Sequence, residues 1–105
     1  MEEVYLKIEK YYQEQHEEVC KRLRKWQNTT YCDEQLKFDL MDFAECKHIQ
    51  SYSTLFNKIK RRLKDDPENL SKVETIVAPL DLKDSKTFTK KNVEKIQKKL
   101  KHKLK

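Results

Sequence analysis

The chain has 105 residues, of which 36% are hydrophobic and 40% are charged, and its formal net charge is +6. This length allows one domain with one core, and the absence of glycine excludes phosphate loops, nucleophile elbows and dinucleotide-binding turns. A chain without glycine also favours helices over sheets and tight turns. We therefore expect an all-α fold, a small bundle of four to five helices with a basic C-terminal helix.

The sequence carries no sign of secretion or of a membrane anchor. No apolar run approaches the ~20 residues that cross a bilayer, and residues 1–3 (MEE) are acidic where a secretory signal would be basic. Cys20, Cys32 and Cys46 are odd in number and widely spaced, which fits reduced thiols better than a disulfide framework. The sequence predicts a soluble intracellular protein of the cytoplasm or nucleus, without a membrane span.

A first long helix is predicted over residues 2–27, where apolar residues form a stripe that drifts slowly around the helix. Thr30 is the expected N-cap of a second helix. One side of that second helix collects four apolar residues, and Phe38, Met41 and Cys46 lean toward another side. Two apolar sides predict that this helix is the most buried of the bundle, and they also leave room for a homodimer.

A third helix is predicted over residues 51–63, with Ser51 or Ser53 as its cap and a strongly amphipathic pattern of apolar residues. The phase of the apolar stripe is lost around residues 47–51. The sequence leaves open whether the second and third helices are separate or form one bent helix.

A fourth helix is predicted to start at Asp66 and Pro67, because proline suits the first helical position and aspartate suits the cap before it. Residues 78–79 (Ala-Pro) stop this helix. Leu80 and Leu82 are expected to cover the core from an extended connection.

The last segment carries the charge imbalance of the chain. From Lys83 onward, ten lysines stand against Asp84 and Glu94, a net charge of +8, so residues 1–82 sum to −2. Such asymmetry along a chain is typical of a segment that engages an anionic partner.

A final helix is predicted after Thr89, its expected cap, with Phe88 and Val93 in hydrophobic-staple positions. The apolar residues of this helix fall on one narrow stripe, which we call the seam: Val93, Ile96, Leu100 and Leu104. Lysines cover most of the remaining circumference.

The chain therefore divides into a helical bundle body, residues 1–82, and a basic amphipathic C-terminal helix, residues 83–105. The sequence leaves open whether this helix belongs to the same domain or is a flexible appendage. Because the seam holds a minority of the apolar residues, the body is expected to fold after deletion of residues 87–105.

Residues that support catalysis or metal binding are scarce. Cys46 and His48 lie two apart, which directs them to different sides of a helix. Only His16 and Cys20 have a spacing that shares a helical face, and Cys46 or His48 would have to complete a metal site with them. Buried free cysteines explain the pattern better. We expect no enzyme, no catalytic residue, no cofactor and no metal site.

Four hypotheses explain the basic helix: nucleic-acid binding, an acidic protein surface that receives the seam in a groove, an anionic membrane, and a solvated helix. Lysines neutralise phosphates and release counterions, and the scarcity of arginine in the segment speaks against base-specific contacts. Basic residues of the third helix would extend the surface if the two helices lie side by side.

The sequence thus predicts a non-enzymatic binding module that engages nucleic acid, DNA or RNA, through its basic helix. The alternative is a protein–protein adaptor, regulator or inhibitor that docks by helix packing. The predicted nucleic-acid-binding residues are Lys58, Lys60, Arg61, Arg62, Lys64, Lys90, Lys91, Lys95, Lys98, Lys99, Lys101 and Lys103.

Overall fold

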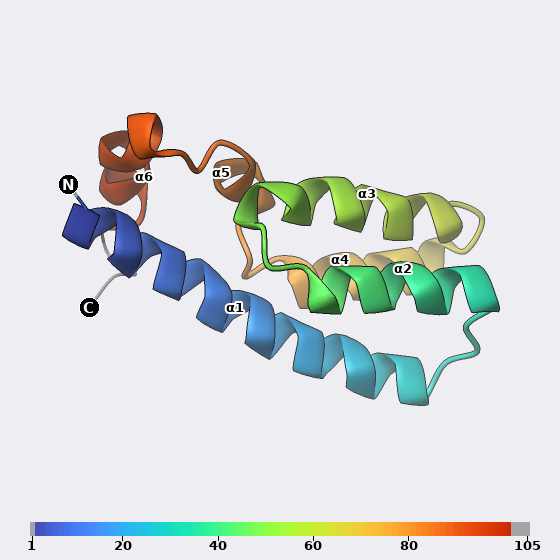
Figure 1. Cartoon of the computed structure of the whole chain (residues 1–105). Helices are drawn as coiled ribbons and strands as arrows, with labels where there is room; N and C mark the ends of the chain where they lie inside the picture. The colour runs from blue at the N-terminus through green and yellow to red at the C-terminus, as the bar shows by residue number, and fades with distance from the viewer. Residues whose placement is uncertain (1, 102–105) are drawn as a thin grey trace.

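A computed structural model of the chain describes residues 2–101, and over this range it is all-α without a strand (Figure 1). The predicted fold class is confirmed. The α-helices are α1 (Glu2–Asn28), α2 (Glu34–Glu45), α3 (Tyr52–Arg62), α4 (Pro67–Val77), α5 (Leu82–Lys86) and α6 (Val93–Lys99). Two short 3-10 helices, η1 (Ile49–Ser51) and η2 (Lys90–Asn92), come directly before α3 and α6.

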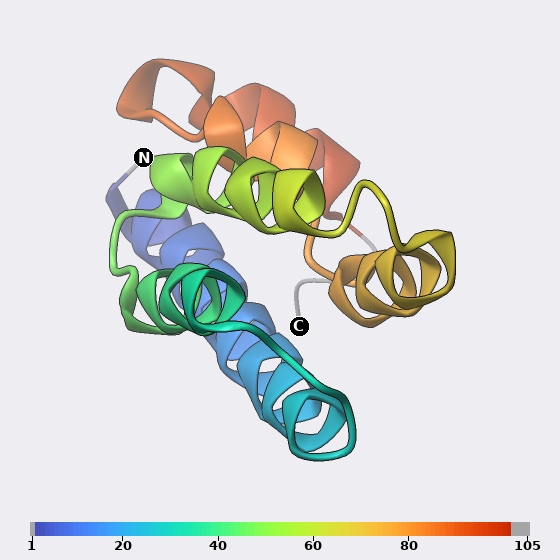
Figure 2. The same cartoon turned by 90° about the vertical axis from the view of Figure 1, so that its right-hand side faces the viewer.

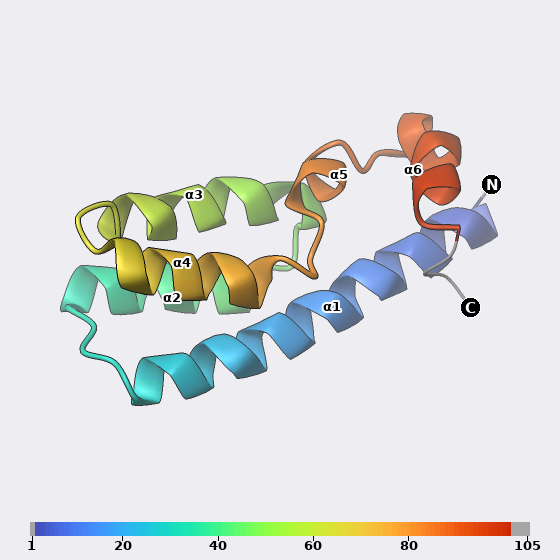
Figure 3. The ribbon, with the colours of Figure 1, turned by 180° about the vertical axis from the view of Figure 1, so that it is seen from behind.

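Helix α1 runs along the molecule, which measures 44 × 21 × 21 Å. Helices α2, α3 and α4 lie over the half of α1 that ends at Asn28, with α2 and α4 on opposite sides (Figures 1 and 2). Helices α5 and α6 continue toward the N-terminal end of α1, as the view from behind also shows (Figure 3). One hydrophobic core runs through all of these layers.

Helix α1 forms as predicted because one face of it is apolar along its whole length. Its buried residues recur every three or four positions: Ile8, Tyr12, His16, Val19, Leu23 and Trp26. Exposed pairs of opposite charge four residues apart, such as Glu17 with Lys21, support the other face by a few tenths of a kcal/mol each. The helix therefore gains most of its stability from the buried face.

The start of α2 differs from the prediction. Asp33, and not Thr30, is the N-cap, and its carboxylate accepts a hydrogen bond from the backbone N–H of Leu36 at 2.8 Å. Aspartate also places a negative charge at the positive end of the helix dipole, which threonine does not. The helix consequently begins at Glu34.

The prediction that α2 is buried on two sides is wrong. Leu36, Leu40 and Phe43 are buried, whereas Phe38 and Met41 are 54% and 51% exposed. The neighbours of α2 are α3 and α1, and both pack on the side that carries Phe43. Helix α2 is therefore a peripheral helix with an exposed apolar side.

Helices α2 and α3 are two separate helices, which resolves the choice that the sequence left open. Residues 46–48 are not helical, and η1 follows them before α3 begins. Ser51 precedes α3 but its side chain makes no capping hydrogen bond. The loss of phase in the apolar pattern thus marks a true break.

The start of α4 is confirmed, since the Asp66 side chain accepts a hydrogen bond from the N–H of Asn69 and Pro67 is the first helical residue. Leu80 is buried and Leu82 packs against the core, as predicted, but the segment from Leu82 onward is not an extended connection. It forms the five-residue helix α5, whose cap Asp81 accepts a hydrogen bond from the N–H of Asp84. Asp84 and Ser85 of this helix are buried.

The seam of α6 is part of the core. Val93, Ile96 and Leu100 are at most 2% exposed, and α6 packs on α1. Phe88 is fully buried, and its ring stacks on Tyr5 of α1 with centroids 4.6 Å apart. The sequence led us to expect that the body folds after deletion of residues 87–105. Because these side chains are part of the core, we now expect that the deletion prevents folding. The predicted seam residue at position 104 lies outside the described residues.

The cap of the last helix also differs in detail from the prediction. Thr89 has the extended backbone of a cap, but its side chain makes no capping hydrogen bond. The helix starts instead through η2, and the Asn92 amide donates a hydrogen bond to the carbonyl of Thr87 at 2.9 Å. The staple residues Phe88 and Val93 are both buried.

Tyr12→Phe is expected to stabilise the protein by about 1 kcal/mol, because the buried Tyr12 hydroxyl has no hydrogen-bond partner within residues 2–101. Burial and the nearby charge of Asp84 raise the pKa of Tyr12, so its hydroxyl stays neutral. Urea unfolding measures the change in the free energy of unfolding. Tyr11→Phe, which alters a partly exposed ring, is the control. A loss of stability greater than about 1 kcal/mol in Tyr12→Phe would show that the hydroxyl has a partner.

His16 joins α1 to the end of α2. Its Nε2 lies 2.7 Å from the carbonyl oxygen of Phe43, so it donates the hydrogen bond, and its ring stacks on Tyr52 with centroids 4.3 Å apart. Burial lowers the pKa of His16, and the hydrogen bond to Phe43 opposes that shift only in part. The folded protein therefore favours the neutral imidazole.

The stability of the protein is expected to fall as the pH drops below about 6.5, because the unfolded chain then protonates His16 before the folded chain does. Between pH 7.5 and pH 5.5 the loss from this group is at most about 1.4 kcal/mol. Urea unfolding at both pH values measures it. His16→Gln should flatten this dependence, whereas His48→Gln, a change at an exposed histidine, should keep it. An equal dependence in both variants would contradict the assignment to His16.

Candidate nucleic-acid interface

The exposed surface around η2 and α6 is dominated by lysine side chains. Because the seam points into the core, the remaining positions of the helix point outward. We call the following residues, all exposed, the C-terminal lysine cluster: Lys90, Lys91, Lys95, Lys98 and Lys101. Within residues 2–101 none of them forms an ion pair. The predicted site residue Lys103 lies outside the described part of the chain.

Lys99 has a different role from its neighbours on α6. Its Nζ lies 2.8 Å from Oδ1 of Asp84, whose side chain is buried in α5. The hydrogen bond and the charge of Asp84 raise the pKa of Lys99. Lys99 therefore ties α6 to α5, and its charge is already matched.

The N-terminal end of α1 borders the C-terminal lysine cluster with an aromatic ring and with carboxylates. The Lys90 ammonium lies 5.9 Å from the ring centroid of Tyr5, a cation–π contact. Glu2 and Glu3 line the hollows between α1 and α6. Lys90 and Lys101 line the same hollows, so the cationic surface reaches from the outward side of α6 to its border with α1.

The other predicted basic residues lie on and just after α3, and we call them the α3 basic cluster: Lys58, Lys60, Arg61, Arg62 and Lys64. The end of α3 lies near the start of α2 at one end of the molecule, and α6 lies at the other end (Figures 1 and 3). The structure therefore does not bring the two clusters into one surface.

Two members of the α3 basic cluster are held by intramolecular contacts. Arg62 donates hydrogen bonds to the buried carboxylate of Asp39 at 3.0 Å and to the side-chain oxygen of Gln35 at 3.3 Å. The Lys60 ammonium lies 5.7 Å from the ring centroid of Phe56. Arg62 thus fixes α3 to α2 and has less freedom to bind a ligand.

The predicted pair of His16 and Cys20 does come together, with Sγ of Cys20 3.5 Å from Nε2 of His16, but neither group is poised to react. Nε2 of His16 is engaged by Phe43, and burial raises the pKa of Cys20 to about 11, so its thiol is neutral near pH 7. The Cys46 thiol donates to the carbonyl of His48 at 3.3 Å. Across residues 2–101, no group of three His, Cys, Asp or Glu side chains is placed to hold a metal ion.

Sequence reasoning missed two features of this surface. Lys83 and Lys86 of α5 are exposed and add positive charge beside α6. Asp39 and Asp84 are buried, and neither was predicted from the sequence to be a buried carboxylate. The helical phase of Asp39, three residues after Leu36 and four before Phe43, was the signal that placed it on the buried side.

No helix within the described range is long and apolar enough to cross a membrane. The chain was compared with protein-family models, with curated proteins and with solved structures, and none of the three comparisons found a match.

Proposed function

We propose that the protein is a non-enzymatic nucleic-acid-binding module and that the C-terminal lysine cluster is its binding surface. The observation that carries this proposal is the burial of Val93, Ile96 and Leu100, because the exposed face that remains carries lysines beside Glu94 and Gln97 and has no apolar group to offer a partner. A regular array of unpaired ammonium groups matches a phosphate backbone.

Two of the competing hypotheses for the basic helix, the acidic protein groove and the anionic membrane, each required the seam. An acidic protein with an apolar groove would have to receive Val93, Ile96 and Leu100, which instead fill the core of this protein. An amphipathic helix that lies on an anionic membrane needs the same apolar face. The remaining alternative, a solvated helix without a partner, does not need the seam, and the binding experiment below distinguishes it from a helix that binds a polyanion.

Lysine contacts to phosphates supply affinity without reading bases, since an ammonium is a point charge rather than a two-pronged donor. The C-terminal lysine cluster contains no arginine. The proposed binding is therefore independent of sequence and strongly dependent on salt.

The proposal is tested by removing equal charge from the two basic clusters and measuring binding to a labelled oligonucleotide by fluorescence anisotropy. The C-terminal variant carries Lys91→Gln, Lys95→Gln and Lys98→Gln, and the matched control carries Lys58→Gln, Arg61→Gln and Lys64→Gln. Lys99 and Arg62 stay unchanged because each neutralises a buried aspartate.

The C-terminal variant is expected to lose about tenfold or more in affinity, and the α3 variant no more than about threefold. Equal losses in both would show that net charge and not this surface determines binding. A loss confined to the α3 variant would assign the interface to α3.

A further inference from the structure

The outward side of α2 is the apolar surface of the molecule that lacks a partner in the fold. Four large apolar side chains are exposed in the described part of the chain, Leu6, Tyr31, Phe38 and Met41. Leu6 and Tyr31 lie far apart in the sequence, whereas Phe38 and Met41 lie about one turn apart on α2. This side is independent of the C-terminal lysine cluster, which lies at the other end of the molecule (Figure 1).

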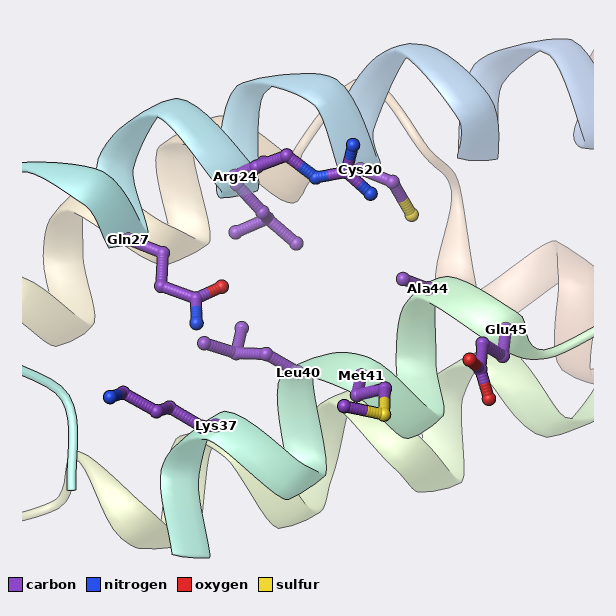
Figure 4. A pocket seen from close by; sticks show the side chains of 9 residues that line it. Cys20, Arg24, Gln27, Lys37, Leu40, Met41, Ala44 and Glu45 are labelled. Carbon is purple, nitrogen blue, oxygen red and sulfur yellow. The ribbon is translucent and has the colours of Figure 1, made fainter. Parts of the chain in front are cut away.

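A groove between α1 and α2 continues this apolar side. Leu40 and Met41 of α2 and Cys20 of α1 line it, with Lys37 at one end and Glu45 at the other (Figure 4). Ala44 lies along the same wall and leaves room because its side chain is a single methyl group. The α2 wall of the groove is therefore apolar between two charges of opposite sign, whereas Arg24 and Gln27 make part of the facing α1 wall polar.

The charges on α2 are arranged symmetrically about Met41. Lys37 lies four residues before it and Glu45 lies four residues after it, and both line the groove. Neither forms an ion pair within residues 2–101. The large Phe38 lies three residues before Met41, and the small Ala44 lies three residues after it.

We propose that the protein forms a homodimer in which α2 packs antiparallel against α2 of a second copy, about a two-fold axis beside Met41. With the two-fold axis at Met41, a residue that lies a given number of positions before Met41 faces the residue of the second copy that lies the same number of positions after it. Lys37 then lies opposite Glu45 of the second copy, and Phe38 lies opposite the small Ala44 of the second copy. The two Met41 side chains meet on the axis, where a flexible thioether packs readily.

The remaining carboxylates of α2 stay at the edge of this interface. Glu34 is the first residue of the helix and reaches the solvent at the end of the helix pair. Asp42 lies on the flank toward α3, where it borders a hollow with Ser51 and Leu55. The two copies therefore form two Lys37–Glu45 pairs, Glu34 and Asp42 remain hydrated, and Asp39, the other carboxylate of α2, is buried beside Arg62.

The size of the surface sets the expected strength. A helix of 12 residues is about 18 Å long, so a contact centred on one such helix from each copy belongs at the small end of specific interfaces, near the threshold of about 1,000 Å². We expect a dissociation constant in the micromolar range, on the order of 10 µM.

Sedimentation equilibrium of the full chain, without nucleic acid, tests the dimer over about 5 to 500 µM. The mass should rise from that of a monomer to that of a dimer. Met41→Glu, which sets two carboxylates against each other on the axis, should remain monomeric. Leu6→Glu, the same change at an exposed apolar residue outside the interface, should dimerise like the unmodified chain.

A charge exchange tests the antiparallel register. Lys37→Glu and Glu45→Lys should each weaken the dimer about tenfold, because each sets like charges opposite one another, and the double variant should restore it. A monomer at every concentration would overturn the proposal. A dimer that is abolished by Leu6→Glu but not by Met41→Glu would also overturn it. The same holds if the double variant dimerises more weakly than both single variants.

Discussion

Deletion of residues 87–105 is expected to abolish the cooperative unfolding transition of the protein. The deletion removes four side chains that are at most 2% exposed, Phe88, Val93, Ile96 and Leu100. Burial of such side chains contributes about 1.5–3 kcal/mol each, so about 6–12 kcal/mol is lost from a total stability of about 5–15 kcal/mol. Urea unfolding followed by circular dichroism measures the result.

The matched control keeps the buried seam and changes the exposed face of the same helix. The variant with Lys91→Gln, Lys95→Gln and Lys98→Gln should unfold cooperatively with a stability within about 0.5 kcal/mol of the unmodified chain. A truncated chain with a sharp transition near that of the full chain would mean that α6 contributes little to the core. Since truncation unfolds the protein, binding experiments require the lysine substitutions instead.

Phe43→Ala is expected to destabilise the protein by about 3–5 kcal/mol. Phe43 is fully buried, and its ring contacts His16, Tyr52 and Phe56 at centroid distances of 5.1, 6.1 and 6.2 Å. The substitution therefore opens a cavity at the point where α1, α2 and α3 meet. Urea unfolding at neutral pH measures the loss.

Phe38→Ala, a change five residues earlier on the same helix, is the control for Phe43→Ala. Its side chain is 54% exposed, so the loss should stay below about 1 kcal/mol. Similar losses at both positions would mean that Phe38 is buried, in the monomer or in the homodimer. Measurement at low protein concentration, where the dimer dissociates, separates these two cases.

Local signals were sufficient to predict α1 and α4. The apolar stripe of α1 recurs every three or four residues along the helix, and Asp66 with Pro67 combines a capping side chain with a fixed backbone angle. Such signals lie within a few residues of one another. They therefore act in the isolated sequence as they do in the folded protein.

The burial of α2 could not be predicted in the same way. Its periodicity shows which residues share a side, but burial depends on where the other helices lie. Phe38 and Met41 were expected to be covered, yet α1 and α3 pack on the side that carries Phe43. Exposed apolar residues are common in folded proteins, so the residue types on the two sides of α2 did not show which side is buried.

The candidate interface was predictable only in part for the same reason. The density of lysines after residue 83 drew attention to α6, and the seam of α6 was recognised. Its burial against α1 joins residues that are far apart in the sequence. The pairing of Lys99 with Asp84 and of Arg62 with Asp39 also depends on packing between different helices. The sequence therefore included both cations in a binding surface where the structure uses them as internal contacts.

The salt dependence of nucleic-acid binding tests the central claim most directly. Anisotropy titrations of a labelled oligonucleotide at several salt concentrations give the slope of log affinity against log salt. If the five lysines of the C-terminal lysine cluster contact phosphates, the slope should be about −4.5 on duplex DNA and about −3.5 on a single strand. The C-terminal triple variant should reduce the slope by about two to three on either ligand. Absence of binding at low salt, or an affinity that does not change with salt, would contradict the proposed function.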